Sequence, residues 1–225
     1  MIETSTILNF LEKITINNNR EWMANNKNEY EKTRETLYEL TQNMIDRLST
    51  IDKTLVGVGY KECTYRFHRD IRFSPDKRPY KEYYSAYIAP GGRKSPKAGY
   101  YIHIQPGGQS LIGGGIYTPP PNLLRIIRKD IAVNGDELQE ILENPDYKKT
   151  FGELKGEKLK KAPKEYSPRH PFIELLKLKS YDAIHIYQDD QFLRKSKQYM
   201  NDMIEKFIIM KPLNDYFNAV LQDYV

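Results

Sequence analysis

Residues 100–117 read Tyr-Tyr-Ile-His-Ile-Gln-Pro-Gly-Gly-Gln-Ser-Leu-Ile-Gly-Gly-Gly-Ile-Tyr, and this stretch decides the fold class. Residues 100–105 and 110–117 are strand-like, and Pro106-Gly107-Gly108-Gln109 between them is typical of a turn. Because two strands joined by so short a turn run in opposite directions, the stretch predicts a β-hairpin. Strands this close along the chain favour a largely antiparallel sheet.

Two further strands are expected upstream of the hairpin. Residues 83–89 are strand-like. From Tyr65 to Phe73, apolar side chains alternate with polar ones, which is typical of a half-buried strand with a polar outer face. Arg69 interrupts this alternation because it falls on the apolar side. We therefore expect either a β-bulge there or a dedicated partner for its guanidinium group.

Helical periodicity and capping residues occur on both sides of the strand-rich segment. We expect helices over Thr6–Lys13, from a capping box at Asn18 to about Ser49, from Pro119–Pro121 to Asn134-Gly135, from Asp136 onward, from Pro171 to Leu176, from Asp189-Asp190 to about Met210, and from Pro212 onward, with a strand over Tyr181–Tyr187. The sequence thus predicts one α+β domain over residues 1–225, with a largely antiparallel sheet flanked by N-terminal and C-terminal helices. Its parts are N-terminal helices (5–50), a strand-rich basic segment (60–118) and a helical and mixed segment (119–225).

The composition is typical of a soluble globular protein. Of the 225 residues, 39% are apolar, which is enough for a core, and 29% are charged. No stretch approaches the roughly 18 apolar residues of a membrane span, and the N-terminus has no basic leader. Cys63 is the single cysteine, so neither an intrachain disulfide nor a cysteine-based zinc cage is available. We expect a cytoplasmic protein without a membrane partner.

Positive charge is concentrated in two windows. Residues 61–97 hold ten Lys/Arg and four acids, for a net charge of +6, and residues 148–164 hold seven Lys and two Glu, for +5. Since the whole chain carries +5, the remainder is acidic at −6. Local basic character on an acidic body indicates local anion binding, although lysine-rich loops can also serve solubility alone.

Short matches to known catalytic motifs fail on inspection. His68-Arg69-Asp70 has the letters of a kinase catalytic loop, but Pro75 stands where that loop needs asparagine. A phosphate-binding loop ending at Gly113 would need lysine and Ser/Thr next, and glycines follow instead. No histidine spacing suggests a metal site, so we expect neither metal nor cofactor. Gly114 is the middle residue of three consecutive glycines. It indicates either a β-bulge or a stretch of backbone without side chains that a ligand can approach closely.

The run Tyr65–Lys81, which reads Tyr-Arg-Phe-His-Arg-Asp-Ile-Arg-Phe-Ser-Pro-Asp-Lys-Arg-Pro-Tyr-Lys, is the most informative stretch for function. It resembles a family of bacterial and fungal conserved hypothetical proteins, domain of unknown function 2461. The resemblance continues through Asn18–Trp22, Gly113–Pro119 and Leu175–Tyr181, and so spans nearly the whole chain. It implies a single full-length domain and leaves the activity open, with no catalytic residues to carry over.

Our leading hypothesis is a site for an anionic, phosphorylated small ligand. In an extended run, Arg66, His68, Asp70 and Arg72 would share one face, and guanidinium and ammonium groups suit phosphate. An enzyme acting on a phosphate ester would use His103 or His68 as its acid–base group, with Asp70 orienting it. The expected ligand-binding residues are Arg66, Arg69, Arg72, Lys77, Tyr80, Lys81, Tyr101 and Gly114.

Two alternatives remain open from the sequence. The first is a nucleic-acid-binding module, in which aromatic rings beside arginines stack on unpaired bases. The second is a protein–protein module in which the arginines are structural, with Asp70 held by Arg69 or Arg72. The oligomeric state does not follow from any of these interpretations.

Overall fold

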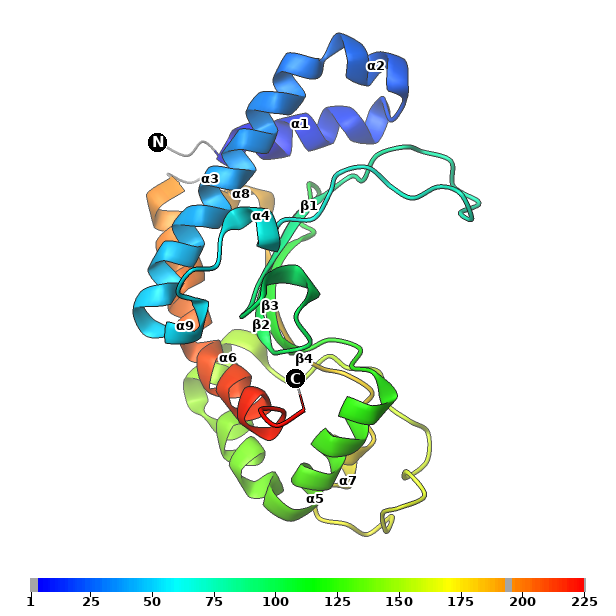
Figure 1. Cartoon of the computed structure of the whole chain (residues 1–225), viewed down its shortest axis with the longest axis vertical. Helices are drawn as coiled ribbons and strands as arrows, with labels where there is room; N and C mark the ends of the chain where they lie inside the picture. The colour runs from blue at the N-terminus through cyan, green and yellow to red at the C-terminus, as the bar shows by residue number, and fades with distance from the viewer. Residues whose placement is uncertain (1–3, 193–195, 225) are drawn as a thin grey trace. The chain divides into compact units, whose positions relative to one another are not determined.

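The computed structural model describes residues 4–192 and 196–224. Over these residues, a four-stranded antiparallel sheet is preceded and followed in the chain by helices, which confirms the α+β class (Figure 1). The strands are β1 (Tyr84–Ile88), β2 (Gly99–Ile104), β3 (Ser110–Ile116) and β4 (Tyr181–Tyr187), in the spatial order β1-β2-β3-β4. The predicted hairpin is therefore the β2–β3 pair, at the centre of the sheet.

The helices before the sheet are α1 (Thr4–Ile16), α2 (Arg20–Asn25), α3 (Lys27–Ile51) and α4 (Tyr60–Cys63), with a short 3-10 turn at Lys53–Leu55. The expected single helix from Asn18 to Ser49 is wrong in one respect, because the chain breaks at Asn26. Asn19, not Asn18, caps α2 by accepting a hydrogen bond from the Trp22 amide (2.8 Å). Asn18 is used elsewhere, on the backbone of Tyr80.

The remaining helical elements are a 3-10 turn (Gly92–Lys94), α5 (Pro121–Glu143), α6 (Pro145–Phe151), α7 (Ile173–Leu176), α8 (Asp189–Phe192) and α9 (Ser196–Val220). The expected helix end at Asn134-Gly135 is instead a kink within α5, where Asn134 has φ −116° and ψ 21°. The expected helix start at Pro212 is wrong, because α9 continues through that residue. Asn214, two residues further, binds the Gly99 carbonyl and the Gly115 amide, so tertiary contacts outweigh the local cost of proline. The expected helix from Asp189 onward crosses residues 193–195, which lie outside the described residues.

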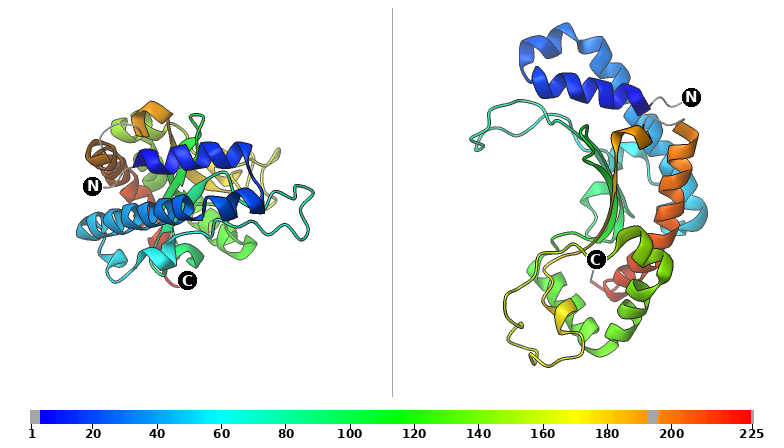
Figure 2. Two further views of the ribbon diagram at one scale, coloured as in Figure 1. Left: turned by 90° about the horizontal axis from the view of Figure 1, so that it is seen from above. Right: turned by 180° about the vertical axis from the view of Figure 1, so that it is seen from behind.

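The segment from residue 65 to residue 83, which we call the arm, is not the strand that its alternation predicted. It runs out from the sheet and returns as two extended stretches, as the views of Figures 1 and 2 agree. Its pairing is limited to an isolated bridge between His68 and Tyr80 and a few backbone bonds, such as Arg69 N–H to the Pro79 carbonyl (2.9 Å). Pro75 and Pro79 lack amide hydrogens, so a continuous ladder cannot form here.

The base of the arm is fixed by aromatic packing. Phe67 is 4% exposed and its ring centroid lies 4.6 Å from Tyr84, 5.7 Å from Tyr30 and 5.9 Å from both Phe10 and Tyr80. These rings come from α1, α3 and β1 as well as from the arm itself. The arm is therefore rooted in the N-terminal core and does not hang from it as a free loop.

The β2–β3 turn is held by an acidic side chain from far along the chain. Gly107 and Gly108 adopt positive φ angles of 81° and 69°, which glycine tolerates without strain. Their amides donate to the two carboxylate oxygens of Asp189, at 2.7 and 3.0 Å. Asp189, expected only as a helix cap, thus begins α8 and also closes the hairpin turn.

By contact density, the described chain forms two compact units, each built from several segments. Unit 1 takes residues from 1–93, 101–112 and 186–204, and unit 2 takes residues from 94–100, 113–185 and 205–225. Unit 1 holds α1 to α4, the arm and β1, and unit 2 holds α5 to α7. The candidate site below lies entirely in unit 1.

Candidate functional site

Side chains from the arm and from β2 come together around Lys81. The Lys81 amide donates to the Phe67 carbonyl across the arm (3.0 Å), which sets the residue at the arm's base next to the sheet. We call this group the Lys81 cluster; its members are Tyr65, Arg66, Lys81, Tyr83, Tyr101, His103 and Gln105. All seven belong to unit 1.

The ammonium group of Lys81 lies over two tyrosine rings. Its Nζ is 5.5 Å from the ring centroid of Tyr65 and 5.2 Å from that of Tyr83, within the range of cation–π contacts. Burial lowers the pKa of Lys81, and the nearby charge of Arg66 lowers that pKa further. Within the described residues, no carboxylate forms an ion pair with Lys81 or with Arg66. Arg66 does lie close enough to Asp70 to contribute to lowering the pKa of that carboxyl.

His103 forms hydrogen bonds through both ring nitrogens. Its Nε2 donates to the side-chain oxygen of Gln105 (2.8 Å), so in the neutral ring Nδ1 accepts from the Tyr101 hydroxyl (3.1 Å). One face of the imidazole stacks on Tyr83, with 4.5 Å between ring centroids. Burial lowers the pKa of His103; the hydrogen bond to Gln105 opposes this shift and the charge of Lys81 adds to it. The imidazole is therefore neutral at pH 7.

Three arginines of the arm are bound to carboxylates of the arm itself. Arg78 and Arg69 both donate to Asp76, at 2.7 and 2.6 Å, and together they hold the pKa of that carboxyl far below its usual range. Arg72 donates two hydrogen bonds to the Asp70 carboxylate, from Nε to Oδ1 (3.0 Å) and from Nη2 to Oδ2 (2.7 Å). Asp76 is thus the dedicated partner expected for Arg69, and Asp70 is oriented by Arg72. Neither carboxylate contacts a histidine in these bonds, so Asp70 does not take the orienting role we had expected.

Tyr80, His68 and Lys77 have surroundings of their own. Tyr80 is 6% exposed, and its backbone exchanges two hydrogen bonds with the Asn18 side chain (3.0 and 3.1 Å). His68 is exposed and lies edge-on to the Tyr80 ring at 5.1 Å. Lys77 is exposed near the outer end of the arm, where its Nζ donates to the Ile71 carbonyl (3.1 Å).

Gly114 lacks a side chain because helix α9 packs against it. A Cβ at this position would fall on the Met210 sulfur and would lie 2.8 Å from the Gly99 carbonyl oxygen, all within unit 2. The close approach that we expected from a ligand is therefore made by the protein's own helix. Of the predicted site residues, the structure brings together Arg66, Lys81, Tyr101 and His103. Arg69, Asp70 and Arg72 are instead in ion pairs within the arm, and Lys77 donates to the Ile71 carbonyl.

Sequence reasoning missed three members of the cluster and one unusual carboxyl elsewhere. Tyr65, Tyr83 and Gln105 resemble ordinary strand residues, and only their position beside a basic run could have marked them. Asp182, on β4 in unit 2, is 9% exposed, and its Oδ1 has no hydrogen-bond partner among the residues that the structure describes. Burial raises the pKa of Asp182 to about 7. A single aspartate in an apolar strand is the sequence signal that could have singled it out.

The other stretches that carried the family resemblance have structural roles. Asn18, between α1 and α2, binds the backbone of Tyr80 in the arm. The Gly115 amide donates to Asn214 (2.8 Å), and the Ser180 hydroxyl accepts from the Thr118 amide (2.8 Å). The Tyr181 hydroxyl donates to the Leu175 carbonyl (3.2 Å). Among the described residues, Arg66 and Lys81 are the two cations close together in the run that form no ion pair with a carboxylate.

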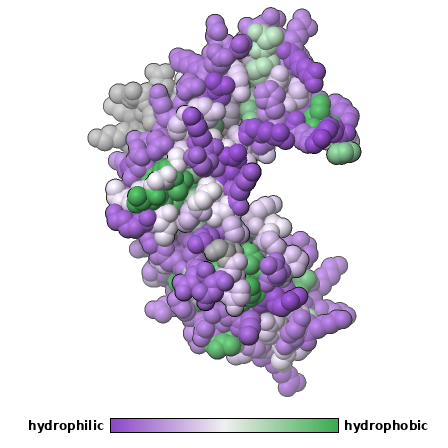
Figure 3. All heavy atoms as spheres, in the orientation of Figure 1, coloured by the Kyte–Doolittle hydropathy of each residue, from purple (hydrophilic) through white to green (hydrophobic). Residues whose placement is uncertain are grey.

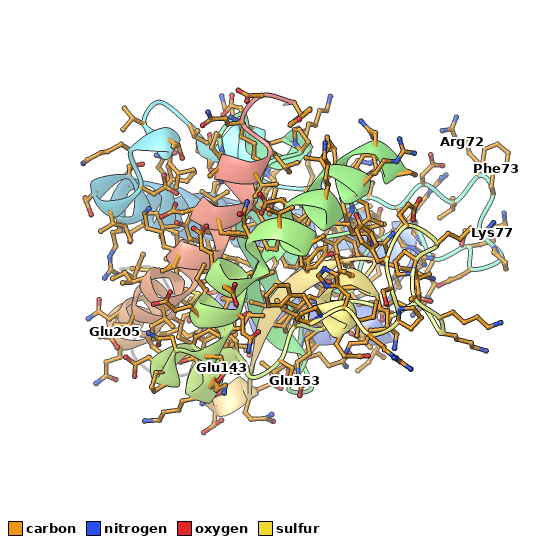
Figure 4. All side chains as sticks on the ribbon, turned by 90° about the horizontal axis from the view of Figure 1, so that it is seen from below. Arg72, Phe73, Lys77, Glu143, Glu153 and Glu205 are labelled. Atoms are coloured by element: carbon orange, nitrogen blue, oxygen red, sulfur yellow. The ribbon has the colours of Figure 1, made fainter. Side chains whose placement is uncertain are left out.

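Two other places in the described residues offer less chemistry. No group of three or more His, Cys, Asp or Glu in the described ranges is arranged to hold a metal ion. A cleft of about 560 Å³ in unit 2 has an apolar floor that includes Leu142 and Phe172, and its rim carries an ion pair between Glu143 and Lys148 (2.7 Å), with Glu143 labelled in Figure 4. Burial raises the pKa of Cys63 to about 11, so the thiol is protonated and unreactive.

Comparison with known proteins defines the class to which this chain belongs. The model of a family of conserved hypothetical proteins, DUF2461, matches residues 6–216, so the chain belongs to that family. Searches of curated proteins and of solved structures found no match. Among the described residues, no helix is long and apolar enough to cross a membrane.

Proposed function

We propose that the Lys81 cluster binds an anionic, phosphorylated small molecule. The observation that carries this proposal is the half-buried ammonium of Lys81, which lies beside Arg66 and has no carboxylate partner among the described residues. A cation that loses hydration without gaining a counterion is destabilising, and an external anion would supply the missing interaction.

The chemistry of the cluster suits a phosphate group in particular. Lys81 offers a point charge, and Arg66 offers a planar fork that can bind two phosphate oxygens. The neighbouring rings of Tyr65 and Tyr83 supply flat apolar surface for the rest of a small molecule. Burial and the charge of Lys81 lower the pKa of His103, which favours the neutral imidazole in the free protein.

Binding is better supported than catalysis. An enzyme acting on a phosphate ester would need His103 as its proton acceptor, because Asp70 is bound to Arg72 and His68 stands apart at the Tyr80 ring. Both nitrogens of His103 already have partners, Tyr101 and Gln105. The cluster therefore favours a ligand-binding domain. To take up a proton from an ester substrate, His103 would first have to give up its hydrogen bond with Tyr101 or with Gln105.

Replacing Lys81 by methionine should remove ligand binding without loss of stability. Methionine keeps most of the apolar stem that packs on Tyr65 and Tyr83 and removes an unpaired charge, so we expect the free energy of unfolding to stay the same or to rise slightly. A phosphorylated compound present at 100 times its dissociation constant should stabilise the wild-type protein by about 2.7 kcal/mol. Thermal shift and calorimetry with inorganic phosphate and sugar phosphates would measure both effects.

The matched control is Lys77→Met, which alters an exposed lysine of the same arm outside the cluster. Lys77→Met should bind as the wild type does, and Lys81→Met should not. If Lys81→Met unfolds more readily than the wild type by more than Lys77→Met does, Lys81 is a structural residue and the proposal is wrong. Equal loss of binding in both variants would instead indicate diffuse attraction by the basic segment.

A further inference from the structure

The outer end of the arm, residues 70–77, carries an aromatic ring fully in solvent. Phe73 is 94% exposed, and Figure 4 shows it pointing outward at the end of the arm, with Arg72 beside it and Lys77 nearby. Figure 3 shows a small apolar spot at this end of an otherwise hydrophilic arm. We call residues 70–77 the arm tip. None of the Lys81 cluster residues belongs to it.

Single exposed apolar residues are common on protein surfaces, so the exposure of Phe73 alone would carry no inference. The second observation is that the arm tip is held in one conformation. The ion pair of Arg69 with Asp76 joins the two stretches of the arm at 2.6 Å, and the Lys77 ammonium closes the tip by donating to the Ile71 carbonyl. A ring held out on a braced support loses little conformational entropy on binding.

The charges around the ring indicate the chemistry of its partner. The arm as a whole, residues 65–83, holds six cations (66, 69, 72, 77, 78 and 81) and three carboxylates (70, 76 and 82), for a net charge of +3, whereas the arm tip itself holds two cations (72 and 77) and two carboxylates (70 and 76). Arg72 uses Nε and Nη2 for Asp70, and within the described residues its Nη1 makes no hydrogen bond, while its guanidinium lies 5.8 Å from the Phe73 ring. A planar cation beside an exposed ring suits a ligand that alternates flat bases with phosphates.

We propose that the arm tip binds single-stranded nucleic acid, with Phe73 stacking on an unpaired base and Arg72 and Lys77 contacting the flanking phosphates. Unpaired strands expose the faces of their bases, whereas a duplex hides them within its stack, so a single outward ring fits the former. Arg66 and Lys81 of the Lys81 cluster contribute to the positive charge of the arm, but the contacts proposed here are made by Phe73, Arg72 and Lys77. The two sites share no residue, and either one can fail while the other holds.

Fluorescence anisotropy with labelled oligothymidylate and oligouridylate tests the proposal on the full chain. Because stacking on an aromatic ring contributes about 1–3 kcal/mol per base, Phe73→Ala should weaken binding roughly 5- to 150-fold. Phe73→Trp should restore binding, since it keeps a flat ring. Ile16→Ala removes a similarly exposed apolar side chain (83%) from α1 and should bind as the wild type does. Folding of each variant is checked by its melting temperature, which should not change for so exposed a position.

Salt dependence distinguishes phosphate contacts from stacking. Lys77→Gln should lower the slope of log affinity against log salt by about 0.7, the value for one phosphate contact to a single strand. Phe73→Ala should leave that slope unchanged. Wild-type protein that fails to bind either oligonucleotide, or a folded Phe73→Ala variant that binds as tightly as wild type, would overturn the proposal. Equal binding to duplex DNA or to anionic lipid vesicles would also overturn it, because neither presents unpaired bases.

Discussion

Gly115→Ala should lower the free energy of unfolding by about 2–5 kcal/mol. Gly115 has a φ of +86°, and a side chain in the left-handed region costs roughly 1–2 kcal/mol. In addition, a Cβ at this position would fall on the carbonyl oxygen of Tyr181 in β4, so the neighbouring strand would have to move. Overpacking of this kind costs about 1–3 kcal/mol more. Urea unfolding followed by circular dichroism would measure the change.

Gly57→Ala is the matched control for this experiment. Gly57 has the same φ of +86°, but nothing lies within 4 Å of the position that its Cβ would occupy. The control should therefore show only the backbone term of about 1–2 kcal/mol. If both variants lose the same stability, the close approach of β3 and β4 at Gly115 is not present in solution.

Asp182 should make the protein less stable as the pH rises from about 4 to about 7. Burial raises the pKa of this carboxyl from 3.8 to about 7, so over this interval the folded chain keeps a proton that the unfolded chain has released. Stability falls with pH wherever the folded state binds more protons. A difference of about 3 in pKa corresponds to about 4 kcal/mol, which is complete above pH 7 and absent below pH 4.

The effect is measured as the difference between the pH–stability curves of wild type and Asp182→Asn. The amide does not ionise, so the variant should be the more stable protein at pH 8 and should lose its advantage toward pH 4. Asp190→Asn, which removes an exposed carboxyl in α8, should run parallel to the wild type. Parallel curves for wild type and Asp182→Asn would show that Asp182 is solvated or paired in solution.

The sheet could be predicted from the sequence because its signals are local. The turn at Pro106–Gln109 fixes the β2–β3 hairpin, and β4 was expected over the residues it occupies, Tyr181–Tyr187. The helix breaks were predicted less well. Pro212 normally ends a helix, but the Asn214 side chain and the glycine-lined surface of β3 hold α9 straight through it. Such contacts join residues far apart in the chain, so no local pattern reports them.

The alternation of apolar and polar residues over Tyr65–Phe73 predicted a strand that the arm does not form. Residues 65–73 have the period of a strand, but the prolines on the returning stretch remove the amides that a partner strand would need. The arginines of the run were expected to act together as a clamp. In the structure, Arg69 and Arg72 are bound by Asp76 and Asp70, whereas Arg66 and Lys81 form no ion pair among the described residues. Which cation is paired depends on how the arm turns back, and composition does not determine this.

The two proposals concern different parts of the basic run. The small-ligand site uses the cations that form no ion pair, and the nucleic-acid site lies in the part of the arm that ion pairs hold together. The paired arginines form ion pairs within the arm, and Phe73, which we propose stacks on an unpaired base, lies at the arm tip. The unpaired cations lie at the base, near His103, where a small anion would complete their interactions. A protein of this family that lacked the arm tip would, on this account, keep the small-ligand site.

The central claim is that Lys81 is an unpaired, partly desolvated cation awaiting an anion, and its own titration tests that claim most directly. NMR of the lysine side chains, with Lys81 assigned by its absence in Lys81→Met, would give its pKa in the free protein and with phosphate or the phosphorylated compound that binds. We predict a pKa lowered from the ordinary lysine value in the free protein, because of burial and the charge of Arg66, and a higher pKa in the complex. An ordinary pKa that no anion changes would contradict the account.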